Sequence, residues 1–279
     1  MIVVTGATGN VGRPLVRALA EAGERVTAVS RGPGDAGSAP GVTTLRADLT
    51  APDAPEVLAP ALAGASALFL LTAASVLPLG GAGVAGVLAA ARAAGVGRVV
   101  LLSSQGVGTG RHPSDIEDAV RAAGVEWTVL RPGGFHSNAG QWAPGVRAER
   151  TVAAPFGDVA LPTVDPADIA AMAAEALTGE GHAGATYVLT GPEPVSPRGQ
   201  AAAIGAALGE PVRFVELSRE QARERMLGFM PAPVVAATLS VLGEPTPEEV
   251  RVSPDVERVL GRRPRAFAEW AADNAALFR

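Results

Sequence analysis

The feature that most constrains the fold is a strand-like run that ends in a glycine-rich turn. The stretch VVTGATGNVGRPLV (3–16) places apolar residues directly before Gly6, Gly9 and Gly12, and a segment with helical periodicity follows. The first glycine permits a sharp exit from a strand, the second lets backbone approach a bound group, and the third lets the helix pack closely. The sequence therefore predicts a strand–turn–helix unit whose helix N-terminus attracts an anion.

Short strand-like runs then alternate with helical segments, most of which close on glycine. Alternation of this kind predicts parallel strands joined by right-handed helical crossovers. We therefore expect an α/β fold built on a Rossmann-type doubly wound parallel sheet, with helices on both faces. The expected strands are 1–6, 25–30, 42–47, 67–72, 98–103 and 127–132.

The rhythm loosens after residue 133, where a stretch rich in glycine and proline (133–165) leads to the helical segment DPADIAAMAAEAL (165–177). A strand over 186–191 and further helical segments follow. We expect a nucleotide-binding domain over residues 1–150 and a smaller α/β substrate lobe over residues 151–279, the two partly interleaved.

Composition excludes several classes of function. The formal net charge of −5 and the absence of charge blocks argue against a nucleic-acid partner. The chain has no cysteine and only three dispersed histidines, so we expect no disulfide and no metal site. The uncharged stretch 57–91 is broken by prolines and glycines, and no signal-peptide pattern opens the chain, so we expect a cytoplasmic protein without a membrane span.

The second expected strand identifies the ligand of the glycine turn. A strand before the turn, a helix after it and a second strand are the context of a dinucleotide site, although a tight turn without a ligand would also use glycines. The second strand ends at Ser30 and Arg31, where NAD sites usually carry an acidic residue; the nearest acid, Asp35, lies beyond a Gly-Pro-Gly turn. Arg31 can pair with a 2′-phosphate, which predicts NADP(H), whereas a solvated loop arginine is the alternative.

Several motifs together resemble the NmrA-like group of atypical short-chain dehydrogenases/reductases, which includes NAD(P)H-binding quinone and azo reductases. They are TGATGNVG, the SR after the second strand, VVLLSSQG, GVEWTVLRPGGFHSN and the later DPADIAAMAAEAL and YVLTGPEPVSPRGQAAAIGAALG. The resemblance implies that the 131–134 turn borders the nicotinamide. Together with residues that end or follow the expected strands, the expected cofactor contacts are Gly6, Thr8, Gly9, Asn10, Val11, Gly12, Ser30, Arg31, Asp48, Leu49, Thr72, Ala73, Ser103, Arg131, Pro132 and Gly133.

The chain departs from most short-chain reductases in its general acid. Those enzymes use a Tyr followed one helical turn later by a Lys, which lowers the pKa of the Tyr and orients the ribose. Here all 23 basic residues are arginine, and the only tyrosine, Tyr187, lies in a later strand. Tyr/Lys catalysis is therefore excluded, a loss that NmrA-like members often share.

Without that pair, the chemistry favours acceptors that need little proton donation. Hydride transfer to a ketone builds a strongly basic alkoxide, whereas a quinone yields a delocalised phenolate. We expect an oxidoreductase that passes hydride from NADPH to a quinone, azo or enone compound. Two alternatives remain open: a non-catalytic NADP(H)-sensing regulator, and a specialised-metabolism enzyme that uses the fold for isomerisation or cyclisation.

Candidate polar helpers lie after the fifth strand and after the 131–134 turn. Ser104 and Gln105 are placed to hydrogen-bond the acceptor, unless they only satisfy loop backbone. His112 and His136 are candidate proton donors, of which His136 is the better placed, although a structural role is the alternative. We expect an apolar, aromatic small molecule as substrate and a monomer or homodimer. The expected substrate contacts are Phe135, Asn138, Trp142, Met226, Phe229 and Met230.

Overall fold

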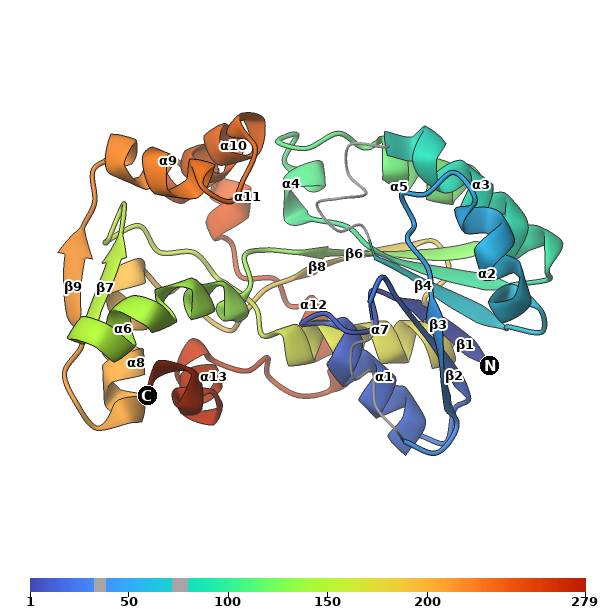
Figure 1. The fold of residues 1–279 in the computed structure, drawn as a ribbon, viewed down its shortest axis with the longest axis horizontal. Helices are drawn as coiled ribbons and strands as arrows, with labels where there is room; N and C mark the ends of the chain where they lie inside the picture. The colour runs from blue at the N-terminus through green and yellow to red at the C-terminus, as the bar shows by residue number, and fades with distance from the viewer. Residues whose placement is uncertain (33–38, 72–79) are drawn as a thin grey trace. The chain divides into compact units, whose positions relative to one another are not determined.

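The structure is a computed structural model that describes residues 1–32, 39–71 and 80–279. These residues form two compact units (Figure 1). The first comprises residues 1–132, 166–189 and 258–261, and the second comprises residues 133–165, 190–257 and 262–279.

The first unit is built on a seven-stranded sheet in which every neighbouring pair is parallel. The strand order is β3-β2-β1-β4-β5-β6-β8, so the direction of winding reverses between β1 and β4. In doubly wound sheets, ligands bind outside the carboxyl ends of the strands at such a reversal. The strands are β1 (Ile2–Thr5), β2 (Val26–Ser30), β3 (Val42–Arg46), β4 (Ala67–Leu71), β5 (Arg98–Leu102), β6 (Glu126–Pro132) and β8 (Ala185–Leu189).

Helices cover both faces of this sheet (Figure 1). α1 (Gly12–Glu21) and α7 (Pro166–Thr178) pack together on one face, and α2 (Ala54–Leu62), α3 (Gly80–Ala93) and α5 (Asp115–Ala122) pack side by side on the other. The central strands β1, β4 and β5 are nearly continuous apolar runs because both of their faces are buried, whereas the edge strand β3 is largely exposed. One core cluster of this unit combines sheet residues such as Leu68 and Leu101 with helix residues such as Leu58 and Leu88. The predicted doubly wound parallel sheet is confirmed.

The second unit contains a two-stranded parallel sheet and mostly helices. β7 (Thr151–Ala154) pairs with β9 (Arg213–Glu216). One core cluster gathers Phe267, Trp270 and Phe278, and a smaller one gathers Leu217, Ala222, Val235 and Leu239. The remaining elements are α4 (Gln105–Gly108) of the first unit, η2 (His136–Trp142), α6 (Ala143–Glu149), α8 (Pro197–Leu208), α9 (Arg219–Leu227), α10 (Ala232–Gly243), α11 (Pro247–Val250), α12 (Asp255–Leu260), α13 (Phe267–Asp273) and η3 (Ala275–Phe278).

The division between the units differs from the boundary expected at residue 150. The chain leaves the first unit after Pro132, at the end of β6, and returns for 166–189. It returns because α7 packs against α1 and because β8 extends the large sheet beside β6. The strand expected over 186–191 therefore completes the first sheet rather than the second lobe.

Candidate functional site

The glycine turn has the geometry that its sequence predicts. Gly6 leaves β1 with φ of +65°, a conformation that side chains rarely adopt. The Gly9 N–H donates to the Gly6 carbonyl oxygen at 3.0 Å, which closes the turn. A Cβ at Gly12 would lie 2.7 Å from the Ala7 Cα and would also collide with the Gly6 carbonyl oxygen. The first helix therefore begins against the backbone of the turn, and only glycine fits there.

The start of α1 fits a bound pyrophosphate. The N-cap residue Val11 supplies no side-chain cap, and the first turn carries no acidic residue. The first amides of an α-helix lack partners within the helix, and the helix dipole makes this end positive. Gly9 and Asn10 are exposed beside it, while Val11 and Gly12 are buried. Backbone amides and a bare turn are the groups that a dinucleotide diphosphate requires.

Arg31 is exposed directly after β2, near the carboxyl end of β3. Asp48 accepts hydrogen bonds from the Thr50 N–H and hydroxyl at 2.9 and 2.8 Å. These bonds hold the pKa of Asp48 below its ordinary value, and the nearby Arg31 charge adds to the effect. Sequence reasoning missed Arg46, whose Nε donates to the Arg31 carbonyl oxygen at 3.0 Å. The parallel register of β2 and β3, which pairs Ser30 with Arg46, is the signal that could have found it.

Other expected cofactor contacts have mixed placements. The Ser30 hydroxyl donates to the Gly32 carbonyl oxygen at 2.8 Å. Leu49 packs against the core cluster that contains Leu68 and Leu101. Pro132 ends β6, and Gly133 begins the second unit. Thr72, Ala73 and Asp35 lie outside the described residues.

The serines after β5 have different partners. Ser103 Oγ donates to Glu117 Oε1 at 2.6 Å, which directs it toward α5. Ser104 Oγ accepts the Gly106 N–H at 3.0 Å and lies 3.1 Å from His112 Nδ1. Sequence analysis named Ser104 and His112 separately but did not pair them. Gln105 begins α4 beside them and is partly buried.

Glu117 is the charged centre beneath this edge. Its carboxylate, in a side chain that is 1% exposed, accepts bonds from Arg131 Nε and Nη2 at 2.9 and 2.7 Å and from Arg121 Nη2 at 2.6 Å. Burial alone raises the pKa of Glu117, but the bonds from Arg131, Ser103 and Arg121 outweigh it, so that its pKa lies below the ordinary value. The Arg131 guanidinium is therefore committed to α5, which leaves the Arg131 backbone as the part that can border a cofactor.

The only tyrosine has a structural environment. Tyr187 is 8% exposed, and its hydroxyl lies 2.9 Å from His182 Nδ1. The His182 carbonyl oxygen accepts the Thr128 hydroxyl at 2.8 Å. Because His182 precedes the amino end of β8, this cluster lies away from the carboxyl ends of the strands.

His136, named as a proton donor from the sequence, is 1% exposed within the second unit. Its Nδ1 lies 2.9 Å from Thr163 Oγ1, and its Nε2 lies 3.2 Å from the Arg265 carbonyl oxygen. Its ring meets the Phe267 ring edge-on at 5.3 Å. With both ring nitrogens engaged and the ring enclosed, these contacts favour a packing role over proton donation.

The expected substrate contacts lie in the second unit and differ in exposure. Phe135 and Trp142 are partly buried, and Trp142 packs against the cluster of Phe267 and Trp270. Asn138 is exposed, and its carbonyl oxygen accepts the side-chain amide of Gln141. The remaining three are Met226 and Met230, which pack against the smaller core cluster, and Phe229, which is 63% exposed.

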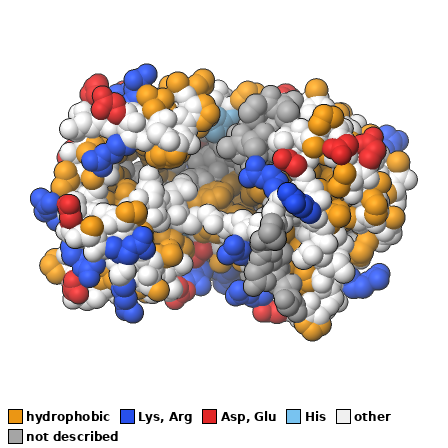
Figure 2. Space-filling view, in the orientation of Figure 1, with side chains coloured by type: hydrophobic (Ala, Val, Ile, Leu, Met, Phe, Trp, Pro, Cys, Tyr) orange, Lys and Arg blue, Asp and Glu red, His pale blue; other side chains and the backbone are white. Residues whose placement is uncertain are grey.

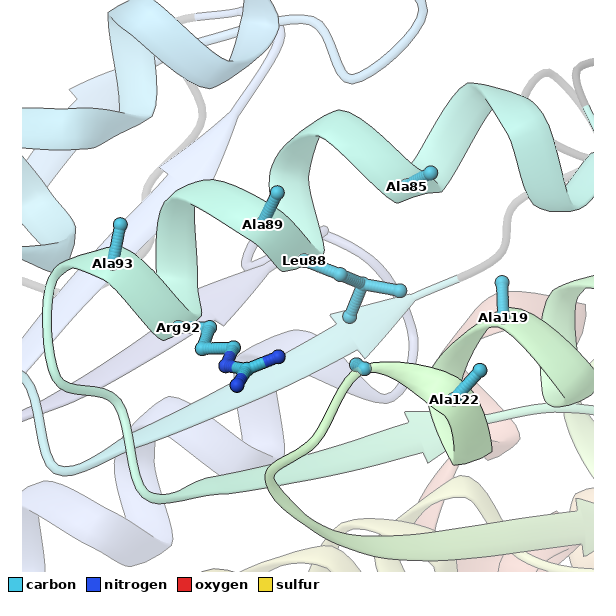
Figure 3. A pocket seen from close by; sticks show the side chains of 8 residues that line it. Ala85, Leu88, Ala89, Arg92, Ala93, Ala119 and Ala122 are labelled. Carbon is cyan, nitrogen blue, oxygen red and sulfur yellow. The ribbon is translucent and has the colours of Figure 1, made fainter.

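A pocket of about 590 Å³ lies between α3 and α5, away from the carboxyl edge of the sheet (Figure 3). Its lining is almost wholly alanine, with Leu88 and Arg92 as the larger side chains, and the Arg92 guanidinium extends toward the end of α5 (Figure 3). One cation among methyl groups offers no nucleophile, acid or base. This pocket is therefore not part of the candidate site at the glycine turn and the end of β5.

The described residues contain no group of side chains that could hold a metal ion. Within the same ranges, no helix combines the length and the hydropathy needed to cross a bilayer. On the face drawn in Figure 2, acidic and basic side chains are interspersed with apolar ones.

Comparison with known proteins agrees with this geometry. A family described as NAD(P)H-binding matches residues 6–180. The chain is 39% identical to a (4-alkanoyl-5-oxo-2,5-dihydrofuran-3-yl)methyl phosphate reductase of Streptomyces griseus, over 100% of this chain and 99% of that protein. It is 35% identical to an NAD(P)H azoreductase of Xenophilus azovorans, again over 100% and 99%.

A solved structure of an NADPH-dependent quinone oxidoreductase from Escherichia coli, complexed with NADPH, has the same fold. It matches with a TM-score of 0.80 and 25% identity, over 98% of this chain and 99% of that one. A triphenylmethane reductase of Citrobacter sp. complexed with NADP(H) matches with a TM-score of 0.79 at 23% identity, over 99% and 100%. The predicted NAD(P)H-binding reductase family is confirmed: the chain belongs to the NAD(P)H-binding family and is an NAD(P)H-dependent reductase.

Proposed function

We propose that the protein transfers hydride from NADPH to an electron-poor conjugated acceptor of the quinone, azo or enone type. One observation carries the proposal: the carboxyl edge of the large sheet presents a glycine cradle and the Ser104–His112 pair, while the only tyrosine is buried against His182 and the chain has no lysine. Such an edge can bind the cofactor but lacks the strong general acid that ketone reduction requires.

The cofactor contacts follow from the edge described above. The amides of the glycine turn and of the start of α1 would hold the diphosphate. Arg31 would pair with the 2′-phosphate, with Asp48 and Leu49 beside the adenine. The bound cofactor supplies a hydride with its electron pair. The other expected contacts, Thr72, Ala73, Ser103, the Arg131 backbone, Pro132 and Gly133, remain part of this proposal.

The proposed acceptor class follows from how strongly each acceptor needs a proton when it gains hydride. A quinone that gains hydride becomes a delocalised phenolate, so its reduction depends mainly on how the reactants are held face to face. Azo and enone acceptors depend more strongly than quinones on the donation of a proton. A hydroxyl such as that of Ser104 can supply one hydrogen bond to the acceptor atom, which suits this range better than a simple ketone.

The named substrates of the relatives support this class. The dihydrofuran named for the Streptomyces griseus protein carries a ring alkene conjugated with a ring carbonyl and an alkanoyl group. The relative from Xenophilus azovorans is named for azo reduction. Both names describe π-systems poor in electrons. We propose that apolar residues of the second unit contact the substrate, mainly Phe135, Trp142 and the 226–230 segment.

The test is a panel of acceptors with purified protein. We expect NADPH oxidation with simple quinones, azo dyes and acyl-substituted butenolides, and much slower turnover of unconjugated ketones. Faster reduction of the ketones than of the conjugated acceptors would overturn the proposed class. Tight NADPH binding without turnover of any acceptor would favour the NADP(H)-sensing alternative.

A further inference from the structure

Ser104 and His112 form a hydrogen-bonded pair after the carboxyl end of β5, with 3.1 Å between Ser104 Oγ and His112 Nδ1. We propose that Ser104 is a catalytic residue that donates the proton to the reduced acceptor. His112 is then a positioning residue that orients the Ser104 hydroxyl and returns a proton to it. This inference rests on the reductase function proposed above and names the proton donor of that site.

The orientation of the hydroxyl follows from counting its hydrogen bonds. A serine hydroxyl donates once and accepts twice. Ser104 Oγ accepts the Gly106 N–H at 3.0 Å, and it accepts a second bond when His112 Nδ1 carries a proton. Both acceptor positions are then filled, so that the Ser104 proton points to neither neighbour and is left for the acceptor. The opposite tautomer would turn that proton toward His112, which makes the tautomer decisive.

The loop between residues 106 and 112 is shaped to seat the imidazole. A Cβ at Gly106 would lie 2.6 Å from His112 Nδ1 and 2.8 Å from its Cε1. The Gly106 carbonyl oxygen accepts the N–H groups of Arg111 and His112 at 2.8 and 3.0 Å. A residue without a side chain thus lets the ring lie over the helix turn that orients Ser104.

Neighbouring groups do not offer the same arrangement. Ser103 donates to the buried Glu117 at 2.6 Å, so its proton is already committed. His136 and His182 are buried, whereas Ser104 and His112 are partly exposed and can exchange protons with water. Two donors on one oxygen also stabilise the alkoxide that remains after proton donation, which supplies part of what a Tyr/Lys pair provides elsewhere.

The proposed step is balanced. The acceptor gains a hydride and its electron pair from the reduced cofactor, and its oxygen, nitrogen or carbon gains a proton as the Ser104 Oγ–H bond breaks. The Nδ1 proton of His112 passes to Oγ while Nε2 takes one proton from water. The imidazole stays neutral and changes tautomer, and exchange with water resets it. One proton from solvent is consumed for each acceptor reduced.

The first test measures the tautomer of His112 and its dependence on Ser104, and it needs no enzymatic turnover. Ring nitrogens of ¹⁵N-labelled histidine are observed by NMR in the wild-type protein, with assignments from the variants His112→Asn and His182→Asn. We expect the resting His112 to carry its proton on Nδ1 and expect the Ser104→Ala variant to shift that resonance. A His112 protonated only on Nε2, or one that does not respond to Ser104→Ala, would overturn the pairing. This result stands even if no acceptor in the panel is reduced.

The second test separates acceptors by their need for a proton. Ser104→Ala should slow enone and azo turnover by about 100-fold, the lower end of general-acid effects, and quinone turnover by only a few-fold. His112→Asn keeps a side-chain N–H but no relay, so we expect it to retain more enone activity than His112→Phe. Gly106→Ala should displace the ring and resemble His112→Phe. Equal losses for enone and quinone in all four variants, with NADPH affinity retained, would indicate a structural role and overturn the proposal.

Discussion

Two hydroxyl–imidazole pairs among the described residues of the first unit differ in burial and in position along the sheet. Ser104 Oγ lies 3.1 Å from His112 Nδ1, and the Tyr187 hydroxyl lies 2.9 Å from His182 Nδ1. The first pair is partly exposed after the carboxyl end of β5. The second is buried, with Tyr187 inside β8 and His182 before its amino end. Similar bonds thus occur at opposite ends of the same parallel sheet, and ligands bind only at the carboxyl ends.

The surroundings of each pair explain the difference. The His182 carbonyl oxygen accepts the Thr128 hydroxyl of β6, and its Nε2 lies 3.8 Å from Glu175 of α7. The second pair therefore joins two strands and a helix. The first pair directly follows Ser103, which donates to Glu117 of α5, and Glu117 in turn accepts two bonds from Arg131 of β6, so that these bonds fix the end of β5 against α5 and β6. Glu117 with Arg121 and Arg131 thus forms a charged layer that supports the end of β5, where we propose the reaction, whereas the buried pair is itself a structural support.

Removal of the charged layer should have the largest effect. Glu117→Ala leaves Arg131 and Arg121 without their shared carboxylate, and we expect the free energy of unfolding to fall by about 3 kcal/mol. Urea denaturation followed by tryptophan fluorescence measures the change. Asp118→Asn, on the exposed face of the same helix, is the matched control and should cost less than about 1 kcal/mol. Equal losses in the two variants would show that Glu117 does not support the edge.

The same layer makes a prediction about pH. Because the folded-state pKa of Glu117 lies below its unfolded value near 4.5, its contribution to stability is complete above that pH. It is lost as the pH falls through the lower folded-state value. The Glu117→Gln variant should therefore lose less unfolding free energy than the wild type between neutral pH and pH 3. Parallel pH profiles for the two proteins would contradict the lowered pKa.

A substitution at the carboxyl edge of the sheet should change the affinity for the cofactor more than it changes the free energy of unfolding. Arg31→Ala removes an exposed guanidinium, and we expect NADPH binding to weaken by about 1.5–3 kcal/mol while NADH binding changes much less. Titration of both nucleotides by calorimetry measures the difference. Arg17→Ala, on the exposed side of α1, is the matched control. Unchanged discrimination between the nucleotides would direct attention to Arg46, which donates to the Arg31 carbonyl oxygen.

Sequence analysis could predict the first unit because its signals are local. The apolar runs at β1, β4 and β5 are buried parallel strands, and Gly6 has the positive φ that its residue type allows. The helix after it has Leu15, Val16 and Leu19 buried, as its periodicity indicates. A chain that repeats strand and helix has few alternatives to a doubly wound sheet.

The remaining features depend on contacts between distant residues, which leave no local pattern. Nothing near Glu117 in sequence shows that it will bind Arg131, and the turn from Gly106 to His112 has no periodicity. The expectation of two partly interleaved domains divided at residue 150 did not name α7 and β8 as the segments that return to the first unit. His136 follows a motif that drew attention to it, yet its ring is enclosed by residues from 163 onward.

The smallest effect should come from the buried pair, and it should fall on stability alone. Tyr187→Phe leaves the His182 imidazole without its hydroxyl partner in a buried site, so we expect a loss of about 1–2 kcal/mol in unfolding free energy. The turnover number with quinones should stay unchanged, because the hydroxyl lies within the sheet and not at its carboxyl edge. Unfolding and turnover are measured on the same preparation, and His182→Asn completes a double-mutant cycle that isolates the coupling between the two side chains. A large loss of turnover in a stable Tyr187→Phe protein would mean that the tyrosine acts in catalysis after all, and the division between a reactive pair and a supporting pair would no longer hold.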